Sequence, residues 1–338
     1  MSNTAQVSHA DSPILSVRGL KVYFPIYSGR LFARPIPLKA VDDVNFDLYP
    51  GETLGVVGES GCGKSTLGRG ILQLLKPTAG EVIWLGDHLE SLPARELIRH
   101  RKELQIIFQD PLASLNPRMT IGDIIAEPLT VHFPELNAAE RKIRVAKMMQ
   151  QVGLLPLMIN RYPHEFSGGQ CQRIGVARAM ILKPKLIICD EPVSALDVSI
   201  QAQIINLIQD LQKSFGLSLI FISHDLSIVR HISHRILVLY LGNVMEVADK
   251  ETLYNTPRHP YTTALISAVP IPDPDLEKNK DRIVLHGDLP SPLSPPSGCV
   301  FRTRCPITKP VCAAEKPKLT DAGQNHQVAC HFWDRQLP

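Results

Sequence analysis

The chain has 338 residues, of which 44% are hydrophobic and 20% are charged, and its formal net charge at pH 7 is +3. This apolar content excludes a globally disordered protein, and the length favours one main domain with an additional tail, because single cores stop growing at roughly 250–300 residues. Lys and Arg are interspersed with Asp and Glu along the chain, so charge alone indicates no nucleic-acid partner.

No stretch of the sequence has the ~18 consecutive apolar residues that a membrane-spanning helix needs. The segment Met1–Pro13 has neither a charged start nor an apolar run, so it is not typical of a secretory signal. We therefore expect a cytosolic location. In that compartment the 7 cysteines are expected to be reduced thiols or metal ligands and not disulfides.

The first half of the chain begins with patterns typical of strands, over Ile14–Phe24, Val41–Leu48 and Thr53–Val57. The third strand is apolar on both faces, and a glycine-rich segment and a helical pattern over Lys64–Leu75 follow it at once. This order is the strand–loop–helix unit of nucleotide-binding α/β folds. The next patterns predict two strands and then an inserted helical subdomain, over Glu81–Leu85, Leu104–Phe108 and Ile121–Val152.

The second half alternates between strand and helix patterns, over Leu186–Cys189, Ile200–Phe215, Leu219–Ser223, Leu226–Ile232 and Ile236–Tyr240. Such alternation predicts a parallel sheet with crossover helices. We place the end of this domain near residues 242–249. Seven prolines between Pro270 and Pro296 then predict a stiff, extended linker.

The glycine-rich segment Gly58–Ser65 fits the pattern G-x-x-x-x-G-K-[ST] between a predicted strand and a predicted helix. Glycines let the backbone curl around phosphate oxygens with its N–H groups inward, and the following helix N-terminus adds positive potential. The residues expected to bind the nucleotide here are Gly58, Ser60, Gly61, Cys62, Gly63, Lys64, Ser65 and Thr66. Lys64 is expected to reach the β- and γ-phosphates, Ser65 to ligate Mg²⁺, and Thr66 to contact the α-phosphate.

The segment Leu186–Glu191 consists of four apolar residues followed by two carboxylates. The acids should therefore lie at the carboxyl end of a buried strand, where α/β sheets bind ligands. Asp190 is expected to hold Mg²⁺, directly or through water, and Glu191 to orient or deprotonate the attacking water. A buried strand that simply ends in an acidic turn is the alternative, and the phosphate loop argues against it.

The segment Phe166–Gln170, with the sequence F-S-G-G-Q, resembles the signature motif of ABC-type ATPases, with Phe where Leu is commonest. Ser167 and Gln170 fit an S-x-x-Q capping box for a helix over Gly169–Leu182, and Gly168 and Gly169 leave its N-terminus open to an anion. The resemblance extends from Ile14 to Asp249. It implies an α/β fold of the ABC-type P-loop ATPases, with a mixed core sheet, an antiparallel β subdomain, a helical subdomain at about residues 110–180 and a C-terminal extension.

The resemblance also implies roles for residues outside the two nucleotide motifs. Gln109 is similar to the glutamine that contacts Mg²⁺ and the attacking water, and that couples the site to the membrane subunits. His224 is similar to the histidine that contacts the γ-phosphate. With Glu191, these two are the expected catalytic residues. Phe24 is the expected aromatic partner of adenine, and Tyr23 is the alternative. In this family the signature motif of one subunit completes the ATP site of another.

The segments Asn255–Leu265 and Leu289–Cys305 resemble the C-terminal extension of dipeptide and oligopeptide importers, which we assign to residues 250–338. Nearly the whole chain is similar to the second ATP-binding subunits of bacterial dipeptide permeases. The resemblance implies an ATPase that powers import of dipeptides or short oligopeptides from the cytoplasmic face of the inner membrane. The implied partners are a second ABC ATPase subunit, two transmembrane permease subunits and an external peptide-binding protein, and not nucleic acid.

Two alternative functions are weighed against this one. Soluble ABC ATPases that act on nucleic acid or ribosomes usually carry two cassettes or a long coiled coil, whereas this sequence has one cassette and no heptad run. A regulatory module that only binds nucleotide would not need Glu191.

Four of the seven cysteines lie near the end of the chain, at Cys299, Cys305, Cys312 and Cys330. Four thiolates can bind a zinc ion or a [4Fe–4S] cluster. The 5, 6 and 17 residues between them contain no C-x₂-C hairpin, which favours the cluster, and related importer subunits are understood to carry one. Reduced thiols without metal are the alternative. Cys62, Cys171 and Cys189 lie inside the nucleotide motifs and are expected to be small apolar fillers.

Overall fold

The computed structural model describes residues 12–27, 35–270, 273, 275, 278, 282–323 and 325–334. Most of Met1–Pro13, and most of the predicted linker before residue 282, lie outside the described residues. The chain divides into two compact units. Unit 1 is made mainly of Tyr49–Thr53 and Ser91–Ile222, and unit 2 of Pro13–Leu48, Leu54–Glu90 and Ser223–Pro338.

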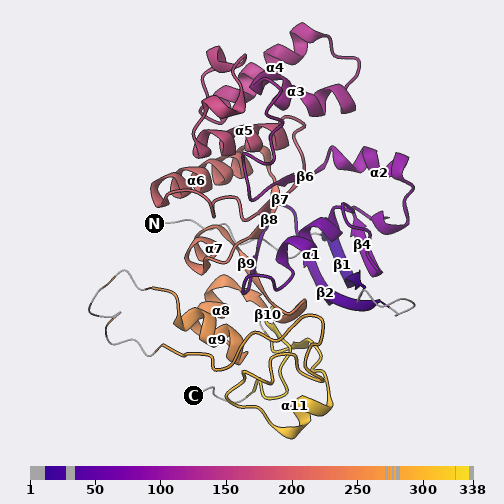
Figure 1. The fold of residues 1–338 in the computed structure, drawn as a ribbon, viewed down its shortest axis with the longest axis vertical. Coiled ribbons are helices and arrows are strands. Elements are labelled where there is room, and N and C mark those ends of the chain that lie inside the picture. The colour runs from indigo at the N-terminus through magenta and orange to yellow at the C-terminus, as the bar shows by residue number, and fades with distance from the viewer. Residues whose placement is uncertain are drawn as a thin grey trace. The chain divides into compact units, whose positions relative to one another are not determined.

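Unit 1 combines three parallel strands in the order β8-β7-β6 with a group of helices. The strands are β6 (Leu104–Ile107), β7 (Leu186–Asp190) and β8 (Ser218–Ile222). The helices are α2 (Ala94–Arg101), α3 (Ile121–His132), α4 (Ala138–Gln151), α5 (Gly168–Met180) and α6 (Val198–Phe215), with short 3₁₀ turns at Pro156–Met158 and Pro163–Glu165. Every residue of β7 and β8 is buried, as their continuous apolar runs predict for parallel strands. Figure 1 shows α3, α4, α5 and α6 grouped together.

The predicted helical subdomain over Ile121–Val152 contains two helices, α3 and α4. Asn137 starts the second helix, because its side chain accepts a hydrogen bond from the Glu140 N–H while the Glu140 carboxylate accepts one from the Asn137 N–H. This reciprocal pair is a capping box, which satisfies N–H groups that a continuous helix would not leave open.

Unit 2 contains an antiparallel sheet in the order β2-β1-β4-β5 and strands of a mixed sheet in the order β11-β12-β10-β9-β3. The antiparallel strands are β1 (Leu15–Ile26), β2 (Ile36–Leu48), β4 (Ala79–Trp84) and β5 (Asp87–His88). The mixed strands are β3 (Thr53–Val57), β9 (Arg235–Tyr240), β10 (Asn243–Asp249), β11 (Thr320–Asp321) and β12 (Gln327–Val328). β3 pairs in parallel with β9, whereas β9, β10, β12 and β11 pair antiparallel.

The helices of unit 2 are α1 (Lys64–Ile71), α7 (Leu226–Ile232), α8 (Lys250–Asn255), α9 (Pro260–Ser267) and α11 (Pro310–Ala314), and a 3₁₀ turn spans Leu89–Ser91 at its border. The segment near residues 242–249, where we place the end of the main domain, contains the strand β10, whose pairing with β9 is irregular between Val244 and Glu246. Through β12, this strand joins the C-terminal part of the chain to the sheet, as the orange and yellow ribbons of Figure 1 show.

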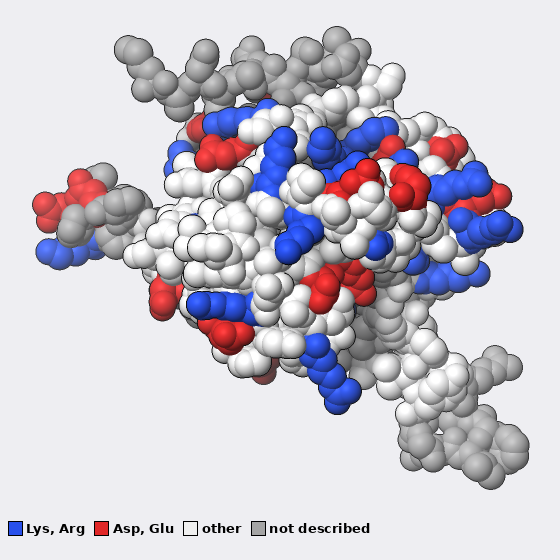
Figure 2. Space-filling model, turned by 90° about the horizontal axis from the view of Figure 1, so that it is seen from above, with Lys and Arg blue, Asp and Glu red and all other residues white. Residues whose placement is uncertain are grey.

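The surface carries charges of both signs. On the face seen in Figure 2, Lys and Arg side chains are interspersed with Asp and Glu and do not form one extended patch. Among the described residues, no helix has the length and apolar character required to span a bilayer.

Candidate functional site

The phosphate loop joins β3 to α1 in unit 2, as predicted. Gly63 is the N-cap of α1 and has a φ of 104°, in the region that favours glycine. A Cβ atom at this position would lie 2.0 Å from the carbonyl oxygen of Ala40 in β2. The loop and β2 therefore approach each other so closely that a larger residue at position 63 would displace one of them.

Lys64 begins α1 and is 4% exposed. Its ammonium group donates hydrogen bonds to the carbonyl oxygens of Gly58 at 2.9 Å and of Glu59 at 3.1 Å. The first turn of α1 contains no acidic residue. A positive side chain and the positive end of a helix thus meet in one loop, which is an arrangement that binds anions.

Cys62 is a buried member of this loop, with 1% of its surface exposed. Burial raises the pKa of the thiol to about 11, although Lys64 opposes the shift. The thiol is therefore protonated at neutral pH. Cys171 and Cys189 are also fully buried, and burial raises the pKa of both. The prediction that these three cysteines are apolar fillers is confirmed.

The two carboxylates of unit 1 lie at the end of β7, as predicted. Asp190 is the last residue of the strand and is 1% exposed. Glu191 follows with a φ of 47°, which is uncommon for a residue other than glycine, and its N–H donates to the Ile222 carbonyl oxygen at 3.0 Å. Non-glycine residues held in this region carry strain and are concentrated at functional sites.

Gln109 lies just beyond β6 and meets Glu191. Its amide nitrogen donates a hydrogen bond to the Glu191 carboxylate at 3.1 Å. Because β6 and β7 are adjacent parallel strands, their carboxyl ends bring these two side chains to the same edge of the sheet. The hydrogen bond from the amide fixes the orientation of the Glu191 carboxylate.

The signature segment forms the start of α5. Ser167 is the N-cap, its hydroxyl oxygen accepts from the Gln170 N–H at 3.4 Å, and the Gln170 side chain accepts from the Ser167 N–H at 3.0 Å. The predicted capping box is confirmed. A Cβ atom on Gly169 would lie 2.5 Å from a methyl group of Ile200, so α6 packs directly against this helix start.

The remaining predicted residues of the site belong to unit 2. Phe24 and Tyr23 are half-buried neighbours in β1, and the Tyr23 hydroxyl donates a hydrogen bond to the Asp42 carboxylate. This hydrogen bond ties the Tyr23 side chain to β2, which contains Asp42. His224 lies between β8 and α7 and is exposed.

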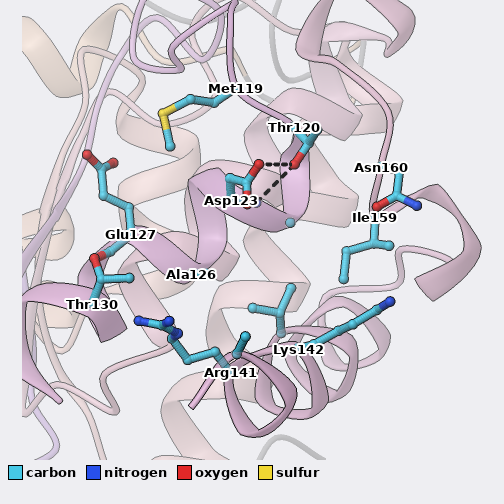
Figure 3. A pocket seen from close by; sticks show the side chains of 13 residues that line it. Met119, Thr120, Asp123, Ala126, Glu127, Thr130, Arg141, Lys142, Ile159 and Asn160 are labelled. Carbon is cyan, nitrogen blue, oxygen red and sulfur yellow. Dashed lines mark hydrogen bonds between the residues drawn. The ribbon is translucent and has the colours of Figure 1, made fainter. Parts of the chain in front are cut away.

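A groove of about 510 Å³ lies between α3, α4 and the turn at Ile159 in unit 1 (Figure 3). Its polar lining includes Thr120, Asp123, Glu127, Thr130, Arg141 and Lys142. Arg178 of α5 connects this region with the segment after Gln109, because its guanidinium donates to the Ser114 carbonyl oxygen at 2.6 Å. Burial lowers the pKa of Arg178, and the charge of Glu127 opposes that shift.

The four C-terminal cysteines are neighbours in unit 2. Burial raises the pKa of Cys305 to about 11, and the other three thiols add to the shift. Burial likewise raises the pKa of Cys299 to about 11. The Phe332 N–H donates to the Cys330 sulfur at 3.4 Å. Within the part of the chain that the structure describes, however, no group of three or more His, Cys, Asp or Glu side chains is arranged to hold a metal ion.

Comparison with known proteins assigns the family. The family model for ABC transporters matches residues 41–194, and the model for the C-terminal region of oligopeptide/dipeptide transporters matches residues 245–312. The oligopeptide transport ATP-binding protein OppF of Haemophilus influenzae is 62% identical over 326 residues, which cover 96% of this chain and 98% of the relative. This chain belongs to the oligopeptide transport ATP-binding proteins. OppF of Escherichia coli is 60% identical, with 96% and 97% of the two chains covered. AppF of Bacillus subtilis is 54% identical, with 95% and 97% covered.

Solved structures agree with this family assignment. The ATP-binding cassette MJ0796, in a dimeric post-hydrolysis state bound to ADP and Pi, has a TM-score of 0.62 and 28% identity and covers 70% of this chain and 98% of its own. The chain therefore has the ABC ATPase fold, and it is an ATPase subunit of an ABC transporter. The alternative function on nucleic acid or ribosomes finds no support among these relatives.

Proposed function

We propose that this chain hydrolyses ATP with Glu191 as the general base and thereby powers the uptake of peptides through a membrane complex. The observation that carries the proposal is the Gln109–Glu191 hydrogen bond at the carboxyl end of a fully buried strand. A carboxylate in that position, oriented by an amide and held in a strained conformation, suits the activation of water. The high identity to oligopeptide transport proteins supports peptides as the cargo.

The other residues divide the binding of ATP among them. The loop Gly58–Thr66 would bind the phosphates, with Lys64 as its charged group, and Phe24 would stack on adenine. Ser65, Asp190 and Gln109 offer hydroxyl, carboxylate and amide oxygens, the donors that Mg²⁺ prefers. When bound, Mg²⁺ would neutralise charge on the phosphates. His224 would contact the γ-phosphate.

The residues Ser167, Gly168, Gly169 and Gln170 would face the γ-phosphate of ATP bound to a second ATPase subunit. The capped start of α5, with two glycines and no acidic residue in its first turn, supports an anion there. We propose a heterodimer with a different ABC ATPase, associated with the cytoplasmic face of the membrane. The catalytic domain would span residues 14–249 and the peptide-importer extension residues 250–338.

The variant Glu191→Gln tests the assignment of the base. It removes the proton acceptor but keeps the size of the side chain, so turnover should fall by about a hundredfold or more while ATP stays bound. The matched control is Glu103→Gln, because Glu103 forms an ion pair with Lys185 at 2.9 Å on the surface of the same unit. Steady-state ATPase assays and nucleotide retention measure both effects. Normal turnover in Glu191→Gln would refute the proposal.

The groove between α3 and α4 would receive a short segment of a permease subunit. Two observations support this occupant. The groove is large enough for several side chains and carries both Asp123 and Arg141, so it suits a segment with mixed charge and apolar surface. Glu127 in its lining interacts electrostatically with Arg178, and the Arg178 guanidinium donates to the Ser114 carbonyl oxygen in the loop after Gln109. Binding of a permease segment in the groove would thus change the position of the loop that carries Gln109, and with it the site of hydrolysis.

Charge reversal tests this docking site. The double change Arg141→Glu and Lys142→Glu should reduce co-purification of the permease subunits by about tenfold, because like-charge contacts across an interface are costly. Arg95→Glu on α2, outside the groove lining, is the control. Unchanged assembly after the double change would place the permease contact elsewhere.

In the tail, Cys299, Cys305, Cys312 and Cys330 would bind a [4Fe–4S] cluster. The other three thiols contribute to the raised pKa of Cys305, and the Phe332 N–H donates to the Cys330 sulfur, so the four side chains are neighbours. Their proximity supports this proposal, since four thiolates are the usual cluster ligands. The side chains would have to reorient, because they are not arranged to hold a metal ion in the structure.

Anaerobic purification followed by iron and sulfide analysis tests the cluster. We expect iron and sulfide in the wild-type chain, strong loss of both in Cys312→Ser, and retention in the control Cys171→Ser, whose thiol is buried outside the tail. A wild-type chain that contains zinc, or no metal, would overturn the cluster.

A further inference from the structure

Residues of the C-terminal part of the chain form hydrogen bonds with the phosphate loop. Glu59 is the second residue of this loop, and its carboxylate accepts hydrogen bonds from the same guanidinium nitrogen of Arg304 at 2.8 and 3.0 Å. Arg304 lies 245 residues later, next to Cys305 and within the four-cysteine segment, residues 299–330, which we call the cysteine lobe. Both residues belong to unit 2.

The backbone of Glu59 is held by a second residue. Its N–H donates to the hydroxyl oxygen of Tyr261 at 3.0 Å, and Tyr261 is fully buried in α9. The side chain and the backbone of one loop residue are thus fixed by two different parts of the C-terminal extension. The orientation of the adjacent peptide groups depends on both contacts, because a peptide unit is planar.

An aromatic cluster fixes the two residues that hold Glu59. The rings of Tyr240, Tyr261 and Phe301 are all buried, with centroids 4.8 to 5.3 Å apart and inclined to each other. The Arg304 guanidinium lies 6.0 Å from the centre of the Tyr240 ring. Inclined aromatic packing of this kind is specific in geometry, so the contacts to Glu59 are made by rigid groups.

A further contact reaches β2, the strand that touches the phosphate loop at Gly63. Lys316 lies 3.6 Å from the Asp42 carboxylate, which also accepts the hydrogen bond from Tyr23. The N–H of Asp42 donates to the Gly242 carbonyl oxygen at 2.8 Å, and the Gly242 N–H donates to the Cys62 carbonyl oxygen at 2.8 Å. The cysteine lobe and its neighbours therefore support the loop from two sides.

Stability alone does not account for the Arg304–Glu59 pair. The Arg304 side chain is 10% exposed, the Glu59 side chain is 27% exposed, and the Nε atom of Arg304 is buried with no hydrogen-bond partner. A buried ion pair that is incompletely hydrogen-bonded contributes little net stability, because desolvation offsets the attraction of the charges. Its defined geometry at the phosphate loop points to a positional role.

We propose that Arg304 and Tyr261 are positioning residues for the phosphate loop, and that the C-terminal extension is thereby part of the apparatus that binds ATP. By fixing Glu59, they keep the neighbouring N–H groups and Lys64 in the arrangement that receives the triphosphate. This inference rests on the proposed role of the loop in binding ATP.

The test uses the full-length chain with a fluorescent ATP analogue, and the assembled transporter for ATPase kinetics. Arg304→Met and Tyr261→Phe should each weaken binding of the analogue by roughly tenfold and raise KM for ATP, with kcat at saturating ATP close to wild type. Arg302→Met is the matched control, because Arg302 lies in the same loop but its guanidinium donates to Ser297 instead. Arg304→Lys keeps the charge and should recover most of the affinity.

A double-mutant cycle identifies the partner. Arg304→Met combined with Glu59→Gln should bind the analogue no more weakly than Arg304→Met alone, because both changes remove the same interaction. If the double variant instead lost affinity by the product of the two single losses, the proposal would be overturned. It would also be overturned by wild-type affinity in both Arg304→Met and Tyr261→Phe, or by a fall in kcat with unchanged KM, which is expected when part of the protein is simply unfolded. If Arg304→Met does not fold, the test relies on Tyr261→Phe, which removes a single oxygen atom. The same changes in binding of the analogue and in KM are then expected.

Lys64→Ala separates this proposal from the one on which it rests. Normal binding of the analogue in Lys64→Ala would refute the role of the loop itself. Lost binding in Lys64→Ala, together with normal binding in Arg304→Met and Tyr261→Phe, would refute only the positioning role.

Discussion

Acid should destabilise this protein through His259, which is 1% exposed at the N-cap of α9. Its ring nitrogen accepts a hydrogen bond from the Tyr261 N–H at 3.1 Å, so the neutral ring is the form that fits. Burial lowers the pKa of His259 from 6.5 to about 4, although the Glu246 carboxylate opposes the shift. The positive end of the helix also disfavours a charged ring.

The direction of the effect follows from proton binding. Between these two pKa values the unfolded chain binds a proton that the folded chain does not, so the folded state loses stability as the pH falls below 6.5. The contribution of His259 is complete above that pH. At about pH 5 it should have lowered the free energy of unfolding by about 2 kcal/mol.

Urea unfolding of the wild type and of His259→Asn near pH 8 and pH 5 measures the contribution of His259 to the free energy of unfolding. Asn can still accept the Tyr261 N–H bond, because it is a good N-cap residue, but it does not titrate. The wild type should lose about 2 kcal/mol more than the variant between the two pH values. Equal losses in both proteins would show that His259 is not the group responsible and would refute the reasoning.

Two further predictions concern the nucleotide motifs. Gly63→Ala should destabilise the protein more than Gly61→Ala in thermal unfolding, because both positions have positive φ but only a Cβ at Gly63 would meet backbone atoms; equal shifts in melting temperature would contradict this. Ser167→Ala should cost about 1 kcal/mol and also lower ATPase activity, whereas Asn137→Ala, at the N-cap of α4, should cost a similar amount with normal activity. Equal activity in the two cap variants would remove Ser167 from the ATP site.

Features that depend on neighbouring residues could be predicted from the sequence. The strand Thr53–Val57 has the predicted limits, because it follows the turn at Pro50 and Gly51 and carries apolar residues on both faces. The capping box at Ser167 was predictable for the same reason, since its two partners are three residues apart. The same spacing at Asn137 and Glu140 marks the start of α4, which the helical periodicity over Ile121–Val152 alone does not show.

Contacts between distant segments could not be predicted in this way. Glu59 occupies a variable position of the phosphate-loop pattern, and nothing near it in the sequence indicates Arg304 as its partner. The strand β10 could not be predicted from its own pattern either, because the residues Asn243–Asp249 do not alternate between polar and apolar, although a turn at Gly242 precedes them. Its partner β12 has only two residues, too few to give a pattern.

The distance along the chain between Glu59 and Arg304 has a consequence for biosynthesis. Arg304 lies 245 residues after Glu59. The ribosome must therefore synthesise all of the intervening chain after Glu59 before the salt bridge can form. The phosphate loop is synthesised early, whereas Arg304, which holds Glu59, is synthesised late. Premature stops or proteolytic cuts between Thr66 and Arg304 should therefore yield fragments that retain the complete glycine-rich segment but lack the support of Arg304 and bind ATP poorly.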